Sequence, residues 1–116
     1  GYLLLASKLF TVGSQYAEGW NFGPEDSDAR NVEWITSTIC KFWGDTASFS
    51  IDTIPQPHEA NYLKLDCSKA KAELKWTPKW NIETTLKSIV DWNKGFLNGD
   101  NMRNITEQQI EKYFEN

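Results

Sequence analysis

The sequence contains few of the residues that metal sites and disulfide frameworks need. It has one histidine and two cysteines in 116 residues, and Cys40 and Cys67 lie far apart in the chain. No Cys-x-x-Cys pair occurs, and His58 has no second histidine with which to share a metal ion. The pattern argues against a metal site and favours two free, buried or half-buried thiols over a disulfide.

Three other absences narrow the range of functions. The net charge is −4 and the lysines are scattered, so no basic stripe points to a nucleic acid. No apolar run approaches the roughly 20 residues of a membrane span, and no signal peptide is visible, so we expect a cytoplasmic protein. The chain has neither Gly-x-x-Gly-x-x-Gly nor Tyr-x-x-x-Lys, and no residue in it receives a catalytic or cofactor-binding role.

Aromatic residues, in contrast, are plentiful: six Trp, six Phe and four Tyr. Each ring can bury about 150–250 Å², which is more than a small helical domain needs. The rings either form an aromatic-rich core or pack against a further domain, and composition leaves both interpretations open. The chain opens with Gly1-Tyr2-Leu3, without methionine and already inside a periodic apolar pattern, which predicts a fragment of a longer protein.

Hydrophobic periodicity predicts about five helices. Asn31 and Asn81 are expected to cap two of them, which would end at Gly44 and Gly99. The other three are expected over residues 3–12, over 69–75 after a Ser68 cap, and from a capping box at Thr106; Gly13, Gly95 and Gly99 are interpreted as helix ends or kinks.

Short extended segments are expected between these helices. Residues 20–24 and 47–51 have strand-like composition, and Tyr62, Leu63 and Leu65 suggest a third segment. The predicted fold class is therefore an α/β fragment, mostly helical with two or three short strands. It lacks the β-α-β alternation that a complete nucleotide-binding sheet requires.

A proline-marked turn over residues 56–61 carries the most reactive polar side chains. His58 and Glu59 follow Pro57 directly, and a carboxylate suits sugar hydroxyls while an imidazole suits phosphate or a base edge. A solvent-facing loop explains the same residues, and a lone His-Glu pair is no catalytic constellation. Asn31 has two interpretations as well: a helix cap, or a polar group at a helix N-terminus that contacts a ligand.

The sequence around this turn also carries a family resemblance. It reads Pro57-His58-Glu59-Ala60, then Lys64-Leu65-Asp66-Cys67-Ser68-Lys69-Ala70 and Leu74-Lys75-Trp76-Thr77-Pro78. These segments resemble the C-terminal, substrate-binding part of the sugar-nucleotide 4,6-dehydratases of the extended short-chain dehydrogenase/reductase superfamily, and among them the members that act on CDP-glucose. The resemblance runs from Gly1-Tyr2-Leu3 to Met102-Arg103.

The resemblance implies a function for a longer protein. Residues 1–116 would form the C-terminal sugar-nucleotide-binding lobe, without the Rossmann domain that binds NAD. The whole enzyme would be a homodimer that dehydrates a CDP-sugar for the deoxysugars of bacterial surface polysaccharide. Its glycine-rich loop and Tyr-x-x-x-Lys pair would precede residue 1, so the chain alone is expected to be inactive.

The resemblance also implies the substrate-binding residues Gln56, His58, Glu59, Asn61 and Asn31. Relatives typically carry an arginine at the position of Gln56, so a strong phosphate contact from Gln56 is in doubt, and His58 or Asn61 can supply a donor instead. Glu59 suits a ribose or base contact.

Two alternatives remain at this stage. One is the lobe of a GDP-mannose or dTDP-glucose 4,6-dehydratase or of a sugar-nucleotide epimerase. The other is a self-contained interaction module without a ligand. A large exposed apolar surface would distinguish the enzyme lobe from the module, because an autonomous soluble domain rarely exposes more than a few hundred Å² of contiguous apolar surface.

Overall fold

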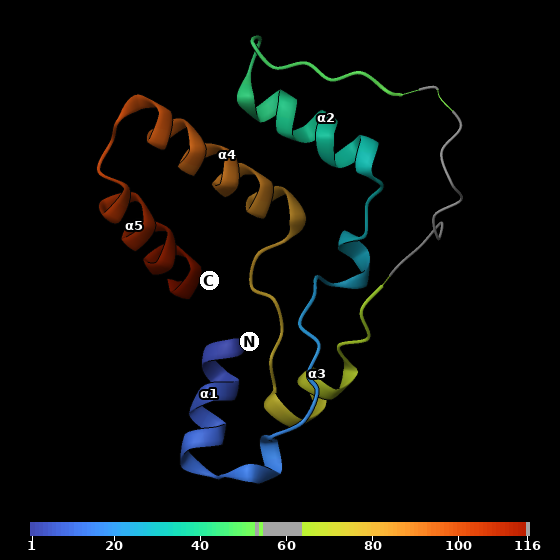
Figure 1. Cartoon of the computed structure of the whole chain (residues 1–116), viewed down its shortest axis with the longest axis vertical. Coiled ribbons are helices and arrows are strands. Elements are labelled where there is room, and N and C mark those ends of the chain that lie inside the picture. The colour runs from blue at the N-terminus through green and yellow to red at the C-terminus, as the bar shows by residue number, and fades with distance from the viewer. Residues whose placement is uncertain (53, 55–63, 116) are drawn as a thin grey trace. The chain divides into compact units, whose positions relative to one another are not determined.

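The computed structural model describes residues 1–52, 54 and 64–115 of the chain (Figure 1). The α-helices are α1 (Tyr2–Thr11), α2 (Val32–Trp43), α3 (Ser68–Leu74), α4 (Ile82–Asn98) and α5 (Met102–Glu115), and the 3₁₀ turns are η1 (Ser14–Tyr16) and η2 (Asp26–Asp28). The chain divides into two compact units. Unit 1 comprises Gly1–Glu25 and Gln56–Pro78, and unit 2 comprises Asp26–Pro55 and Lys79–Asn116.

The predicted α/β class is wrong, because the described residues form helices and no strand. Residues 20–24 and 47–51 have no partner in a β-ladder. A strand needs the N–H and C=O groups of a neighbour about 4.7–4.9 Å away, and strand-like composition does not supply that neighbour. Tyr62 and Leu63 lie outside the described residues, and Leu65 belongs to no strand.

Two helix starts agree with their sequence signals. Asn31 precedes α2 and its Oδ1 accepts the N–H of Trp34 at 2.8 Å. Asn81 precedes α4 and accepts the N–H of Thr84 at 2.9 Å. Each side chain satisfies one of the backbone donors that the first helical turn leaves without a partner. The predicted Asn caps are confirmed.

The start of α3 differs from the prediction. Ser68 is the first helical residue, and Cys67 occupies the N-cap position without a side-chain capping bond. The Asp66 carboxylate accepts the backbone N–H of Ser68 at 2.9 Å. The helix ends at Leu74, its C-cap Lys75 has a left-handed φ of 56°, and Trp76-x-Pro78 follows as expected.

The start of α5 was also misassigned. The helix begins at Met102, and Thr106 lies inside it, with its hydroxyl donating to the Met102 carbonyl at 2.8 Å. Asn101 provides the cap instead, since its Oδ1 accepts the N–H of Asn104 at 3.2 Å. Gly95 ends no helix. It is buried inside α4, where a side chain would collide with the tip of Ile105.

Unit 1 is built around α3 and an aromatic cluster. Ala70 and Leu74 are buried on α3. The Phe22 ring packs edge-on against Trp76, with 5.0 Å between centroids, and against Tyr2 of α1 at 5.3 Å. Residues 20–24 thus pack on helices through their side chains instead of pairing in a sheet.

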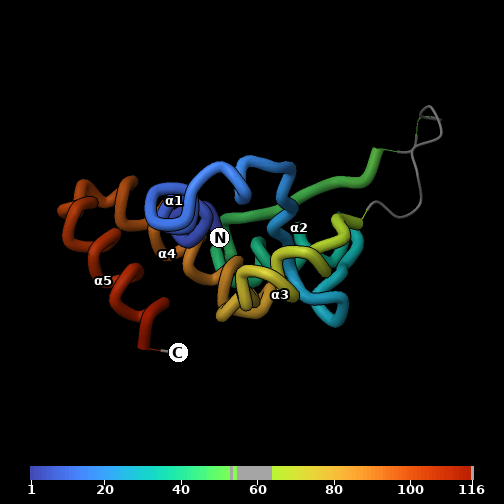
Figure 2. Tube along the Cα trace, turned by 90° about the horizontal axis from the view of Figure 1, so that it is seen from below, coloured from blue at the N-terminus to red at the C-terminus, as the bar shows by residue number. Residues whose placement is uncertain are grey.

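Unit 2 is built around α4, which packs against both α2 and α5 (Figures 1 and 2). Leu86 and Val90 on α4 are 5% and 1% exposed. Polar contacts join the helices at the edges of this core. Trp92 donates from Nε1 to the Thr106 hydroxyl at 3.0 Å, and Lys94 donates to the Phe42 carbonyl at 3.1 Å.

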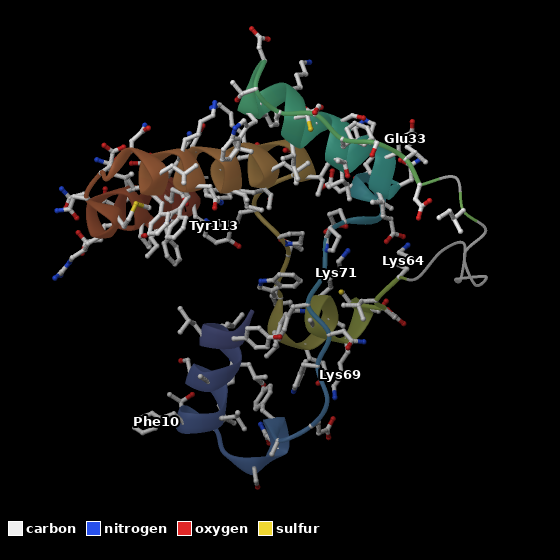
Figure 3. The ribbon with its side chains drawn as sticks, turned by 45° about the horizontal axis from the view of Figure 1, so that its top comes forward. Phe10, Glu33, Lys64, Lys69, Lys71 and Tyr113 are labelled. Atoms are coloured by element: carbon white, nitrogen blue, oxygen red, sulfur yellow. The ribbon has the colours of Figure 1, made fainter. Side chains whose placement is uncertain are left out.

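Much of the apolar side-chain surface stays exposed. On α1, Tyr2 is 80% exposed, Leu3 83% and Phe10 92%, and Phe10 projects away from the helix in Figure 3. Among the described residues, the buried apolar side chains are Cys67, Ala70, Leu74, Leu86 and Val90. Some aromatic rings therefore build small cores, while others face solvent.

None of the helices in the described ranges combines the length and the hydropathy that crossing a bilayer requires.

Burial on α4 generates a stability prediction. Leu86→Ala should lower the free energy of unfolding by about 2–4 kcal/mol, since it removes buried methyl groups and leaves a cavity. Leu97→Ala is the matched control, because Leu97 lies on the same helix and is 68% exposed; its effect should stay within about 0.5 kcal/mol. Urea unfolding followed by circular dichroism measures both, and equal losses would contradict the assigned core.

Candidate functional site

The predicted substrate-binding residues fall mainly outside the described part of the chain. This applies to Gln56, His58, Glu59 and Asn61. The structure does describe Asn31, and it describes residues 64–78, which follow this stretch in the chain.

Asn31 lies at the start of α2, with its side-chain oxygen occupied by the N–H of Trp34. The side chain of the preceding residue, Arg30, makes contacts on both sides of Asn31. Its Nη1 donates to the carbonyls of Ser27 at 2.7 Å and Ala29 at 2.8 Å, and its guanidinium lies 5.3 Å from the Trp34 ring. The capping interpretation of Asn31 is thus realised, and a ligand contact from Asn31 stays a prediction.

After the turn, the chain is fixed by Asp66. The pKa of its carboxyl lies below the ordinary value, because the side chain of Ser68 and then the backbone of Ser68 hydrogen-bond to it, with a smaller contribution from the charge of Lys64. The carbonyl of Asp66 accepts from Asn21 Nδ2 at 3.1 Å. Asp66 therefore hydrogen-bonds both to the first residue of α3 and to the distant Asn21.

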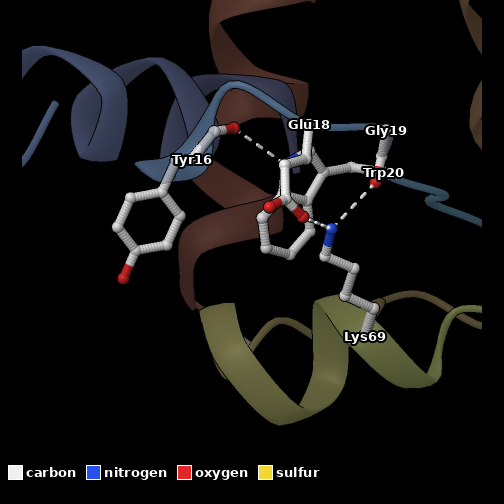
Figure 4. A network of polar contacts seen from close by, with 5 residues as sticks. All are labelled: Tyr16, Glu18, Gly19, Trp20 and Lys69. Atoms are coloured by element: carbon white, nitrogen blue, oxygen red, sulfur yellow. Dashed lines mark hydrogen bonds and ion pairs between the residues drawn. The ribbon is translucent and has the colours of Figure 1, made fainter. Parts of the chain in front are cut away.

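Lys69 of α3 ties this helix to the segment that follows η1 (Figure 4). Its Nζ pairs with the Glu18 carboxylate, lies 3.3 Å from the Gly19 carbonyl, and sits 4.3 Å from the centre of the Trp20 ring. Trp20 in turn donates from Nε1 to the Tyr16 carbonyl at 3.0 Å. An exposed pair of this kind contributes only about 0–1 kcal/mol, so its main effect is positional.

Lys71 makes a second link of the same kind. Its Nζ lies 2.6 Å from Oε2 of Glu25, at the end of the same extended segment. Lys69 and Lys71 both stand on α3 in Figure 3. Two ion pairs and the Asn21 bond therefore hold α3 and the residue before its N-cap, Asp66, against residues 18–25.

Neither a metal site nor a dinucleotide site is assembled from these residues. In the described ranges, no group of three or more His, Cys, Asp or Glu side chains is placed to hold a metal ion. Both cysteines are free thiols, Cys67 buried and Cys40 half-buried. NAD would require a glycine-rich loop between a strand and a helix, and the sequence has no such loop.

Sequence reasoning missed a cavity in unit 2. A hollow of about 400 Å³ opens beside α4 and is lined by Lys79, Lys87, Lys112, Thr84 and Ser88, among others. These lysines are far apart in the sequence and look scattered. The sequence signal that was available is the spacing of Thr84, Lys87 and Ser88, which places them on one helix face.

Comparison with known proteins confirms the resemblance. No family model matches the chain. A CDP-glucose 4,6-dehydratase of Salmonella typhimurium (strain LT2) is 46% identical to it over 113 residues, which cover 97% of the chain and 32% of that protein. The chain therefore spans about a third of the length of this curated relative.

The Asp66–Ser68 contact predicts a measurable pKa change. Because Asp66 has a lowered pKa in the folded chain, its contribution to stability is present above its unfolded pKa of about 3.9 and is lost as pH falls through the folded value. Ser68→Ala removes the largest cause and should raise the pKa of Asp66. Ser68→Thr keeps the hydroxyl and should preserve the lowered value.

A carboxyl ¹³C titration followed by NMR reads the pKa of Asp66 in all three chains. An unchanged pKa in Ser68→Ala would show that the Ser68 hydroxyl is not the cause.

Proposed function

We propose that this chain is the sugar-nucleotide-binding lobe of an NAD-dependent CDP-glucose 4,6-dehydratase. The observation that carries the proposal is 46% identity over 97% of the chain to an enzyme of that name. In this proposal residues 1–116 follow a Rossmann domain in one longer polypeptide. The relative is about three times as long as the matched segment, which leaves room for such a domain.

The proposed reaction converts CDP-glucose to CDP-4-dehydro-6-deoxyglucose and water, which makes the whole protein a lyase. NAD supplies the redox chemistry when it is bound to the other domain. No residue of this chain takes a chemical step in the proposal, and the isolated chain is inactive. The product would serve the synthesis of deoxysugars for lipopolysaccharide, and we place the enzyme, a homodimer, in the cytoplasm.

The role of this chain is to bind the nucleotide sugar. Glu59 would accept hydrogen bonds from ribose hydroxyls or from the base, and His58 or Asn61 would donate to the diphosphate. Lys69 and Lys71 support this role by fixing α3, which follows the predicted turn in the sequence, against Glu18 and Glu25. A fixed neighbouring element leaves less of the chain to be ordered on binding.

The exposed side chains of α1 support a missing partner domain. Tyr2, Leu3 and Phe10 are all at least 80% exposed on one ten-residue helix. A self-contained interaction module has no reason to leave such a helix uncovered, whereas the lobe of a larger enzyme does. In the proposal, the remainder of the same polypeptide covers α1.

Nucleotide binding tests the proposed ligand. Titration of the ¹⁵N-labelled chain with CDP should give saturable amide shifts at residues 56–61 and near Asn31, and UDP, GDP and dTDP should bind more weakly. Glu59→Gln should weaken CDP binding about threefold to tenfold, as expected when a hydrogen bond to a charged group is lost. Glu73→Gln is the matched control, since Glu73 is exposed on α3.

Equal shifts with all four nucleotides, or shifts confined to other residues, would contradict the assigned site.

Self-association tests the uncovered helix. Sedimentation velocity of the isolated chain should show concentration-dependent association through α1, because apolar surface of this kind is covered when a partner is present. Leu3→Ser should reduce the association. Leu97→Ser, an exposed leucine on α4, should leave it unchanged. A chain that stays monomeric at all concentrations would count against a docking face on α1.

A further inference from the structure

The turn between α4 and α5 contains a chemically reactive pair of residues. Asn98 is the last residue of α4 and Gly99 follows it, and this is the one Asn-Gly pair in the sequence. Both residues are exposed. Only residues 99–101 separate α4 from α5, and Figure 1 shows this short connection. A covalent change in the main chain here therefore acts directly on the joint between the two helices.

The residue that follows an asparagine decides how easily the side-chain amide is attacked by the backbone. Glycine has no Cβ, so its nitrogen is unshielded and its backbone adopts many conformations. Asn93 of α4 is also exposed, but Lys94 follows it. Asn104 of α5 is exposed and precedes the β-branched Ile105. Because these larger side chains hinder the approach of the nitrogen, the chemistry favours Asn98.

In the folded chain, hydrogen bonds hold the nitrogen of Gly99. Its N–H donates to the Phe96 carbonyl at 3.1 Å. The next N–H, of Asp100, donates to the Gly95 carbonyl at 3.0 Å. Gly99 itself has a left-handed φ of 76° and ψ of 22°. These features form a Schellman motif, which closes the C-terminus of a helix. The nitrogen is directed into these bonds and not at the side chain of Asn98, so attack requires the end of α4 to open.

We propose that Asn98 is a site of spontaneous deamidation, controlled by opening of the Schellman motif at Gly99. In the open turn the Gly99 amide loses its proton to a hydroxide ion, and its nitrogen attacks Cγ of Asn98. A C–N bond forms and the Cγ–Nδ2 bond breaks. Nδ2 takes a proton from water and leaves as ammonia, and the main chain now contains a five-membered succinimide ring. The reaction uses only water and the chain itself, so it does not depend on the proposed dehydratase function.

Water then opens the succinimide at either of its two carbonyls. Opening at Cγ gives aspartate, with the main chain unchanged. Opening at the main-chain carbonyl of residue 98 gives isoaspartate, in which Cβ becomes part of the main chain and the carboxylate branches from Cα. Either product adds one negative charge to a chain whose net charge is −4.

Both products weaken the end of α4. A carboxylate at position 98 stands at the negative end of the helix dipole, two residues before Asp100, and residues 95–98 of α4 include no basic side chain to offset it. Isoaspartate also lengthens the main chain between the Gly95 carbonyl and the Asp100 N–H, so this bond of the Schellman motif no longer closes. Because the connection to α5 is short, the change reaches the contact between Trp92 of α4 and Thr106 of α5.

Peptide mapping by mass spectrometry tests the site. The chain is incubated at mildly alkaline pH, either folded or unfolded in guanidinium chloride, and sampled over time. The peptide that contains Asn98 should gain the mass that replacing an amide by a carboxyl group adds, as both aspartate and isoaspartate, while Asn93 and Asn104 stay intact. The reaction should be at least about tenfold slower in the folded chain, since the turn must open first.

Two variants isolate the reaction. Asn98→Gln should abolish the mass change, because the longer side chain must close a six-membered ring, which forms far more slowly. Asn93→Gln is the matched control. Asn93 is exposed on the same helix and its Nδ2 donates to the Ile89 carbonyl, and its replacement should leave the rate at Asn98 unchanged. Circular dichroism confirms that both variants are folded.

Hydrogen exchange gives an independent measure of the opening. The protection of the Gly99 amide should match the factor by which folding slows deamidation, because both depend on the same open state. In the isoaspartate product, separated by ion exchange, the amides of Gly99 and Asp100 should lose their protection and the indole N–H of Trp92 should shift.

Three results would overturn the proposal. The first is an Asn98 that stays intact in both the folded and the unfolded chain. The second is an equal rate in the two states, which would show that the Schellman motif does not control the reaction. The third is deamidation of Asn93 or Asn104 as fast as that of Asn98, which would show that Gly99 does not select the site.

Discussion

The fold of the described residues depends on a small amount of apolar burial, divided between two units that together contain five α-helices. In unit 2 this burial rests on Leu86 and Val90 of α4, and in unit 1 on Ala70 and Leu74 of α3. Small folding units bury a modest fraction of their surface and are correspondingly marginal. Helix caps, edge-on ring contacts and polar links between helices therefore contribute more to defining this fold than they would in a domain with a deep core.

The same constraint explains how unit 1 holds its long-range contacts. Without a sheet among the described residues, the extended segment 18–25 is positioned by side chains: two ion pairs from α3, the bond from Asn21 to Asp66, and the Phe22–Trp76 contact. Each of these is individually weak in water. Together they fix α3 against this extended segment.

Features that depend on a few consecutive residues were predicted correctly from the sequence, and features that depend on contacts between distant segments were not. The caps at Asn31 and Asn81 depend on three or four consecutive residues, and the structure confirms both. The strands failed because a ladder needs a partner that no single segment encodes. At α5, the sequence analysis placed the cap at Thr106, but Asn101 accepts the N–H of Asn104 there. The Thr106 hydroxyl accepts from Trp92 of α4, a contact that only the fold creates. Of the candidate site residues, Asn31 is described, as a cap, and the other four lie outside the described residues.

Net charge is a poor guide to which anions this chain can bind. The lysines of α3 face Glu18 and Glu25, so their charge is largely neutralised at this helix. The predicted turn carries Gln56, His58 and Asn61 beside Glu59, so in the proposed function its contacts to a nucleotide come from neutral donors and Glu59. Because the field at a site depends on the groups that line it, nucleotide binding in the proposed function depends on these few side chains and not on the net charge of −4.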